Sequence, residues 1–252
     1  MRYFIELSYK GTPYNGWQRQ PNSVAVQQVL EEAMEKVLRT PVEVVGSSRT
    51  DTGVHATQQY AHFDLPAAIA DPGRAVHSLN ALLPADIAVH RIVPVADDVH
   101  SRFIATHRRY EYRIIRQKNP FLTHEAYIFR PELDLITMNE AAALLLRYDD
   151  FESFSKIHTS VKTFRCHITE ARWYWQGPVL TFSVQSNRFL RGMVRALVGT
   201  LMQVGLGKLS VAEFEQIILS KNRKEAGAQA PPHGLFLVEV GYPAGLLPQA
   251  EL

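Results

Sequence analysis

The stretch CHITEARWYWQGPVLTFSVQS, residues 166–186, predicts a β-hairpin. Strand-forming apolar residues alternate with polar ones on both sides of Gly177-Pro178, a dipeptide that marks a turn. Two strands are therefore expected, at roughly 166–176 and 179–186. Strands joined by so short a turn pair antiparallel. The hairpin thus predicts a fold based on an antiparallel sheet.

The rest of the chain extends this pattern. Alternating residues predict further strands at 3–9, 57–64, 87–93, 110–114 and 235–240, and helical spacing predicts helices at 26–38, 74–82, 139–148 and 211–219. Strands and helices mix without strict alternation, which favours the α+β class with mainly antiparallel sheets. Two comparable halves are expected, an N-terminal one at 1–105 and a C-terminal one at 106–252.

Composition excludes several classes of protein. No segment approaches the ~20 apolar residues that a membrane helix needs. The single cysteine, Cys166, excludes an internal disulfide and a cysteine-cluster metal site, so a reduced, cytoplasmic setting is expected. The ten histidines form no metal-binding spacing, and no glycine-rich phosphate loop is present. We therefore expect neither a metal nor a cofactor.

The charges are unevenly distributed along the chain. Net charge is only +2, but residues 102–116 contain five arginines and one acid, and residues 156–165 contain basic side chains and no acid. The acids gather elsewhere, at 31–35, 97–98 and 149–152. Such segregation suits a face that binds a polyanion, although an ordinary solvated surface would account for the charges equally well.

A helix is expected to begin near Arg188. At 100° per residue, Arg188, Arg191 and Arg195 would then share one face, opposite an apolar face that packs into the core. Three arginines without acids nearby in the sequence call for anions from elsewhere, either phosphates or carboxylates of the protein.

The segment SSRTDTGVHA, residues 47–56, is the strongest candidate for chemistry. Small and turn-forming residues surround one carboxylate, Asp51, and Gly53 permits a left-handed backbone beside it. A simple aspartate turn is the plain alternative. Asp51-Thr52-Gly53 also matches the aspartic-protease triplet, but that chemistry needs two such carboxylates, and this chain has one triplet.

SSRTDTGVHA resembles the catalytic segment of the tRNA pseudouridine synthase A family. Five more blocks resemble that family in the same order: YKGTPYNGWQRQ, SRFIATHRRYEYRI, DDFESFSK, NRFLRGMVRALVGTLMQVGLGK and APPHGLFLVEVGYP. The blocks extend over nearly all 252 residues. A triplet can recur by chance, whereas six ordered blocks do not.

The resemblance implies a fold, an assembly and a reaction. It implies two related α+β halves whose sheets join into one continuous sheet, with helices and loops flanking a central basic cleft. It implies a homodimer that binds tRNA. The implied reaction converts uridine to pseudouridine at positions 38–40 of the anticodon stem-loop, without a cofactor or metal.

The resemblance also implies roles for individual residues. Asp51 matches the catalytic aspartate, Tyr110 the active-site tyrosine, and Arg195 the arginine that pairs with the aspartate. Arg49 matches the residue that helps to evict the target base. The implied tRNA-contacting residues are Val99, His100, Ser101, Arg102 and Phe103, with a second contacting loop near His158–Lys162. Either Leu235 or Leu237 is expected to line the pocket.

These assignments fit the chemistry but leave two questions open. The target base must be extruded from a stacked stem before it can react. Asp51 must then attack as an anion, either at C1′ of the sugar or at C6 of the ring. A non-catalytic tRNA-binding module would show the same charges and fold, so the intact RTD segment is what favours an enzyme.

Overall fold

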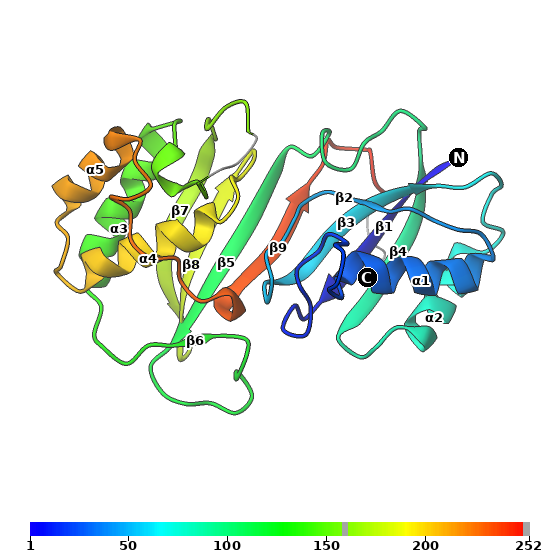
Figure 1. Ribbon diagram of the computed structural model, residues 1–252, viewed down its shortest axis with the longest axis horizontal. Helices are drawn as coiled ribbons and strands as arrows, with labels where there is room; N and C mark the ends of the chain where they lie inside the picture. The colour runs from blue at the N-terminus through cyan, green and yellow to red at the C-terminus, as the bar shows by residue number, and fades with distance from the viewer. Residues whose placement is uncertain (158–160, 249–252) are drawn as a thin grey trace. The chain divides into compact units, whose positions relative to one another are not determined.

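The computed structural model describes residues 1–157 and 161–248 (Figure 1). These divide into two compact units, one formed by residues 1–106 and 237–248 and the other by His107–Phe236. The division lies close to the predicted boundary near residue 105. The closing segment differs from the prediction, because from Leu237 onward it groups with the first unit.

The first unit is built on β1 (Arg2–Tyr9), which pairs antiparallel with β3 (His55–Asp64) and with β4 (Ile87–Val95). The strand order is β4-β1-β3-β9, with the short β2 (Val45–Gly46) also paired to β3 and with β9 formed by Leu235–Gly241. Helices α1 (Val26–Leu38) and α2 (Pro72–Leu82) complete the unit. The alternating residues of β1 are buried, as their spacing predicts.

The second unit has the strand order β9-β5-β8-β7, to which β9 contributes Leu235 and Phe236. β5 (His107–Ile115) pairs antiparallel with β8 (Val179–Ser186), and β8 with β7 (Ile168–Gln176). β6 (Tyr127–Ile128) runs parallel to β5. The helices are α3 (Leu135–Leu144), α4 (Met193–Gly205) and α5 (Val211–Ser220), and short 3-10 turns lie at 145–147, 152–154 and 232–234.

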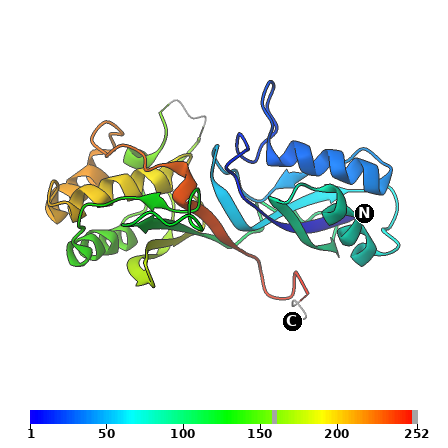
Figure 2. The same ribbon diagram turned by 90° about the horizontal axis from the view of Figure 1, so that it is seen from below.

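The predicted hairpin and fold class are confirmed. β7 and β8 form the hairpin, with Trp173 opposite Phe182 in the register and their rings 4.9 Å apart. Helices and mainly antiparallel strands make the chain an α+β protein, and both ends of the described chain belong to the first unit (Figures 1 and 2). Within the described residues, every helix is too short or too polar to cross a membrane.

The predicted helix from Arg188 is wrong in its starting point. α4 begins at Met193, and its N-cap Gly192 has a left-handed backbone with φ of 70°. Arg188 and Arg191 precede the helix, so only Arg195 belongs to it, and the expected face of three arginines does not form. A left-handed residue cannot continue a right-handed helix, and glycine adopts that conformation without steric cost. The apolar side of α4 is buried, as predicted.

α4 packs unusually close to the segment that precedes β9. A Cβ added to Gly199 would lie 1.8 Å from the carbonyl oxygen of Ala228, so the two backbones touch. The Gly227 N–H donates to the Thr200 Oγ1 at 2.9 Å, which ties the segment to the helix. This contact determines where residues 226–231 lie against α4.

We therefore predict that Gly199→Ala destabilises the protein by roughly 1–3 kcal/mol, because the added methyl group has to displace backbone. The control is Gly73→Ala in α2, where the new Cβ would meet only Asp71 Oδ1 at 3.4 Å. That change should be neutral or stabilise by up to about 1 kcal/mol, since alanine favours helix over glycine. Urea unfolding of both variants measures this. Equal effects at the two glycines would contradict the contact.

Candidate active site

Asp51 lies in a tight turn between β2 and β3 that is held by main-chain hydrogen bonds. The Trp17 N–H donates to the Thr50 carbonyl at 3.2 Å, and the Gly53 N–H donates to the Tyr14 carbonyl at 3.3 Å. Within the turn, the Val54 N–H donates to the Asp51 carbonyl at 3.1 Å. Asp51 itself is half-buried. The loop therefore fixes the backbone of Asp51 while leaving the residue partly accessible to solvent.

Two glycines let another loop approach this turn without intervening side chains. A Cβ on Gly16, whose φ is +80°, would lie 2.4 Å from the Thr50 carbonyl oxygen, and a Cβ on Gly11 would lie 1.9 Å from that of Val54. The Gly11 N–H also donates to the Nδ1 of the buried His55 at 3.1 Å. Residues 10–17 therefore pack directly against residues 50–55, with backbone touching backbone.

The residues before Arg49 are anchored by a buried amide. The Ser47 hydroxyl donates to Gln59 Oε1 at 2.6 Å, and Gln59 Nε2 donates to the Ser48 carbonyl at 2.8 Å. Ser47 and Gln59 are almost completely buried. Arg49 follows Ser48 directly and is exposed, so a rigid support carries an accessible arginine two residues before Asp51.

Within the first unit, the Val99–Phe103 segment is attached to its neighbours through Ser101. The buried Ser101 hydroxyl donates to the Val45 carbonyl and lies 2.8 Å from His62 Nδ1, and the Tyr242 hydroxyl donates to the Ser101 carbonyl. Val99 is buried and His100 half-buried, and the rings of His100 and Phe103 lie 4.2 Å apart.

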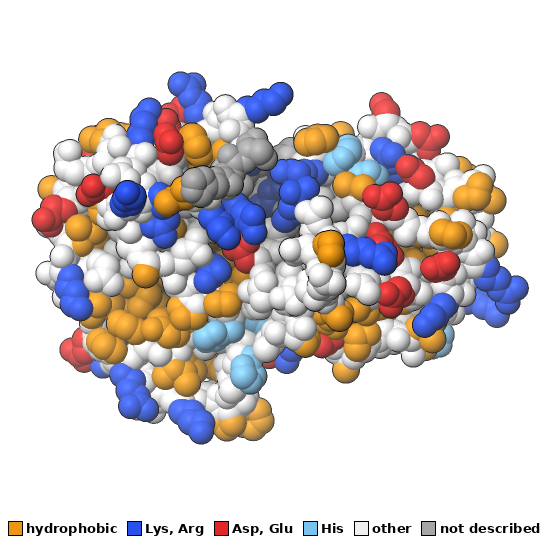
Figure 3. Space-filling model, viewed as in Figure 1, with side chains coloured by type: hydrophobic (Ala, Val, Ile, Leu, Met, Phe, Trp, Pro, Cys, Tyr) orange, Lys and Arg blue, Asp and Glu red, His pale blue; other side chains and the backbone are white. Residues whose placement is uncertain are grey.

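Arg102 and Phe103 are exposed at the end of this anchored segment. Phe103 is 77% exposed, and the Arg102 guanidinium lies 6.0 Å from its ring centroid. An exposed aromatic ring beside a cation is a suitable surface for a nucleotide, because bases stack on aromatic rings and phosphates pair with guanidinium groups. Lys and Arg side chains are grouped rather than evenly spread on the face shown in Figure 3.

Tyr110 lies on β5 of the second unit and is buried. Its ring meets that of Phe189 edge to face, with centroids 5.1 Å apart and planes at 87°. Beside it, the buried Arg108 donates from Nη1 to the Asn187 carbonyl at 2.9 Å. The segment that leads into α4 therefore packs against the strand that carries Tyr110.

Arg195 lies in the first turn of α4 and is bound to the segment before β9. Its Nε donates to the Ala230 carbonyl at 2.7 Å, and the Ala230 N–H donates to the Arg195 carbonyl at 3.0 Å. The neighbouring Tyr112 hydroxyl donates to the Pro231 carbonyl. Burial raises the pKa of Tyr112, and the positive charge of Arg195 partly opposes that rise. Arg195 is thus anchored through its Nε to the segment before β9.

The predicted residues are divided between the two units. Asp51, Arg49, Leu237 and the Val99–Phe103 segment belong to the first unit, and Tyr110, Arg195 and Leu235 belong to the second. Leu235 and Leu237 are both buried. In the second tRNA-contacting loop expected at 158–162, residues 158–160 lie outside the described residues.

Sequence reasoning missed the residues that support Asp51. It assigned no role to Tyr9, Gly11, Gly16 or Trp17, although the block YKGTPYNGWQRQ contains all four of them. The available signal was the pair of glycines in that block, since glycine often marks a position where backbone approaches backbone.

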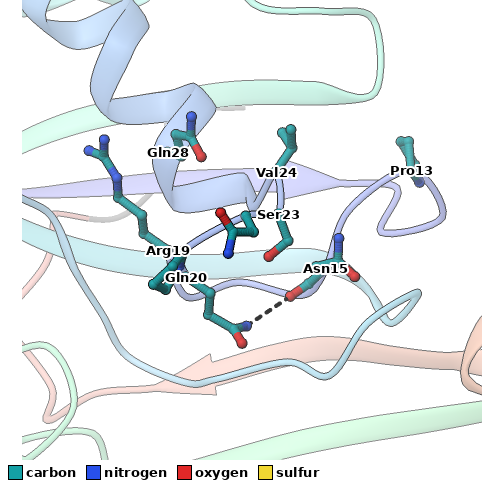
Figure 4. Close-up of a pocket in the computed structure, with 9 residues that line it drawn as sticks. Pro13, Asn15, Arg19, Gln20, Ser23, Val24 and Gln28 are labelled. Atoms are coloured by element: carbon teal, nitrogen blue, oxygen red, sulfur yellow. Dashed lines mark hydrogen bonds between the residues drawn. The ribbon is translucent and has the colours of Figure 1, made fainter.

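In the part of the chain that the structure describes, the predicted site residues coincide neither with a metal-binding cluster nor with a hollow beside α1. Among residues 1–157 and 161–248, no three His, Cys, Asp or Glu side chains are placed to hold a metal ion. A surface hollow of about 830 Å³ lies on the loop before α1 and includes Asn15, Arg19 and Gln20 (Figure 4). None of the predicted site residues lines it.

These parts together define a class of protein. A carboxylate on a rigid loop, an exposed arginine beside an aromatic ring, and a buried tyrosine on an α+β scaffold suit an enzyme that acts on RNA. A family described as tRNA pseudouridine synthase matches residues 7–103 and 141–243. The chain belongs to this family, and it is an isomerase that acts on tRNA.

Relatives match over nearly the whole chain. A protein of Porphyromonas gingivalis called tRNA pseudouridine synthase A is 52% identical, covering 97% of this chain and 98% of the relative. A protein of the same name from Parabacteroides distasonis is 49% identical and covers 98% of each. One from Exiguobacterium sibiricum is 38% identical, covering 96% of this chain and 97% of the relative.

The environment of His62 predicts a pH dependence of stability. Burial, followed by the nearby His100 and Arg2, lowers the pKa of His62 from 6.5 to about 4, while Asp64 acts in the opposite direction. The folded state therefore favours the neutral ring, and the unfolded state binds the proton more readily. Stability from this group is complete above pH 6.5 and is lost as the pH falls from 6.5 towards 4.

We therefore expect the stability advantage of the wild type over His62→Gln to shrink as the pH falls through that window. Urea unfolding at several pH values measures the difference. His77→Gln, at an exposed position on α2, is the control. A wild-type advantage over His62→Gln that stays constant with pH would show that the ring is not kept neutral by the fold.

Proposed function

We propose that the protein isomerises uridine to pseudouridine at positions 38–40 in the anticodon stem-loop of tRNA, with Asp51 as the nucleophile. The observation that carries the proposal is the rigid loop around Asp51, in a chain whose family catalyses this type of reaction. A half-buried carboxylate on a fixed backbone is suited to attack, because its main chain loses little freedom when the substrate binds. Attack at C1′ and attack at C6 both agree with this arrangement.

Arg195 is the proposed partner that keeps Asp51 ionised. A carboxylate enclosed with a substrate tends to take up a proton, and a neighbouring guanidinium opposes this by stabilising the anion. The bond from Arg195 Nε to the Ala230 carbonyl supports the assignment, because it holds the guanidinium in a defined position. The pairing of the two side chains is implied by their positions in the family blocks.

The target base must leave its stack before it can react. Extrusion costs a few kcal/mol, and a side chain that fills the vacated space offsets part of that cost. Arg49 is proposed for this role, since it is exposed and two residues from Asp51. The Val99–Phe103 segment is proposed to bind the tRNA backbone and an unstacked base through Arg102 and Phe103.

Tyr110 is proposed to act on the uracil ring. After the base has rotated and C5 has bonded to the sugar, a proton must leave C5, and a phenol can stack on the ring and assist that step. The edge-to-face contact with Phe189 supports this role because it holds the tyrosine ring in one orientation. Leu235 or Leu237 is proposed to line the same pocket.

The proposal extends to the setting of the reaction. The family resemblance implies a homodimer with tRNA as its substrate and no cofactor, and the single cysteine, Cys166, favours a cytoplasmic setting. All chemical roles are then filled by Asp51, Tyr110, Arg195 and Arg49.

Asp51→Asn is predicted to abolish turnover, because an amide is a poor nucleophile at neutral pH; losses at a nucleophile can reach 10³-fold or more. The measurement uses tRNA that carries tritium at uridine C5, since isomerisation releases that tritium to water. The variant should still bind tRNA. No tritium release by the wild type would instead favour a non-catalytic tRNA-binding module, and equal release by Asp51→Asn would exclude Asp51 as the nucleophile.

Tyr110→Phe is predicted to retain tRNA affinity and lose about 10²-fold in turnover, the range expected when one acid–base group is removed. Single-turnover tritium release gives the rate, and filter binding gives the affinity. Phe189→Leu is a useful comparison, because it keeps the hydroxyl and removes only the ring that orients it. A Tyr110→Phe variant whose affinity falls as much as its rate would indicate a binding role.

A further inference from the structure

A buried pair of hydroxyl groups adjoins the turn that carries Asp51. Tyr9 is the last residue of β1 and is 4% exposed, and its hydroxyl oxygen lies 2.8 Å from Thr50 Oγ1 in a buried hydrogen bond. Thr50 is also buried, and it directly precedes Asp51 in the chain.

Thr50 is therefore held at two points. Its side chain binds Tyr9, and its carbonyl accepts the Trp17 N–H at 3.2 Å. The rings of Tyr9 and Trp17 pack at 6.0 Å, so the two supports of Thr50 also contact each other. The peptide bond between Thr50 and Asp51 is planar. The orientation of the Thr50 carbonyl therefore determines the positions of the backbone nitrogen and Cα of Asp51.

Tyr3 provides an internal comparison on the same face of β1. Like Tyr9 it is almost fully buried, at 2% exposure, and its hydroxyl accepts the Ile69 N–H at 3.0 Å. Both tyrosines thus make a hydrogen bond from one strand, which is buried for Tyr9 and partly buried for Tyr3. They differ in the segment that each bond reaches, since only the bond of Tyr9 reaches the Asp51 turn.

We infer that Tyr9 is a positioning residue for the reaction: its hydroxyl, through Thr50, keeps the Asp51 carboxylate at the place from which it attacks. The inference rests on the proposed role of Asp51 as nucleophile. Tyr9 does not touch the substrate in this scheme. It acts on the rate because a nucleophile displaced by about 1 Å can lose up to ~10²-fold in rate even when the substrate still binds.

The test removes the hydrogen bond from either end. Tyr9→Phe and Thr50→Val should each lower kcat for tritium release about tenfold, the loss expected for one hydrogen bond, with KM for tRNA within about twofold of the wild type. The double variant should be no slower than the slower single variant, because both changes remove one interaction. Thr50→Ser keeps a hydroxyl at that position and should recover most of the rate.

Tyr3→Phe is the matched control, since it deletes the same atom from a buried tyrosine whose bond ends elsewhere. It should leave kcat unchanged even where thermal unfolding shows a similar loss of stability. The inference is overturned if Tyr9→Phe keeps wild-type kcat, or if its kcat falls only in proportion to lost tRNA binding and folded protein. An inactive Asp51→Asn with a fully active Tyr9→Phe would refute only the positioning role, whereas an active Asp51→Asn would refute the proposed function itself.

Discussion

The first unit depends on direct contact between two stretches of backbone. Residues 10–17 pack on residues 50–54 at a separation that a side chain on Gly11 or Gly16 would prevent, because its Cβ would overlap a carbonyl oxygen. The hydrogen bonds across this contact use main-chain groups that would otherwise need water. As a result, a polar loop becomes rigid without being fully buried, which is what a reactive carboxylate requires.

The second unit fixes its arginine by a related arrangement. Gly199 lets the segment before β9 approach α4, and the Ala230 carbonyl then accepts the Nε of Arg195. In both units a functional side chain depends on main-chain partners that come from distant parts of the sequence. Main-chain N–H and C=O groups are present whatever most side chains are. The surrounding side chains can therefore change without moving the functional residue.

Local pattern predicted much of the secondary structure but not every boundary. The hairpin at 166–186 and the strand at Arg2–Tyr9 follow from alternation, because burial of one sheet face imposes a period of two. The start of α4 was predicted wrongly, because the spacing of apolar residues does not reveal that Gly192 has a left-handed backbone. The placement of the closing segment was missed because periodicity does not reveal which sheet a terminal strand joins.

The sequence alone determined the α+β class, the candidate Asp51 and the resemblance to a family, since each depends on residue type and order. Only the tertiary structure decided that Tyr9, Gly11, Gly16 and Trp17 support the Asp51 turn, and that Ala230 holds Arg195. The physical reason is that most of these contacts are made by backbone N–H and C=O groups. Almost every residue carries both groups, so their pairing leaves no pattern in the sequence.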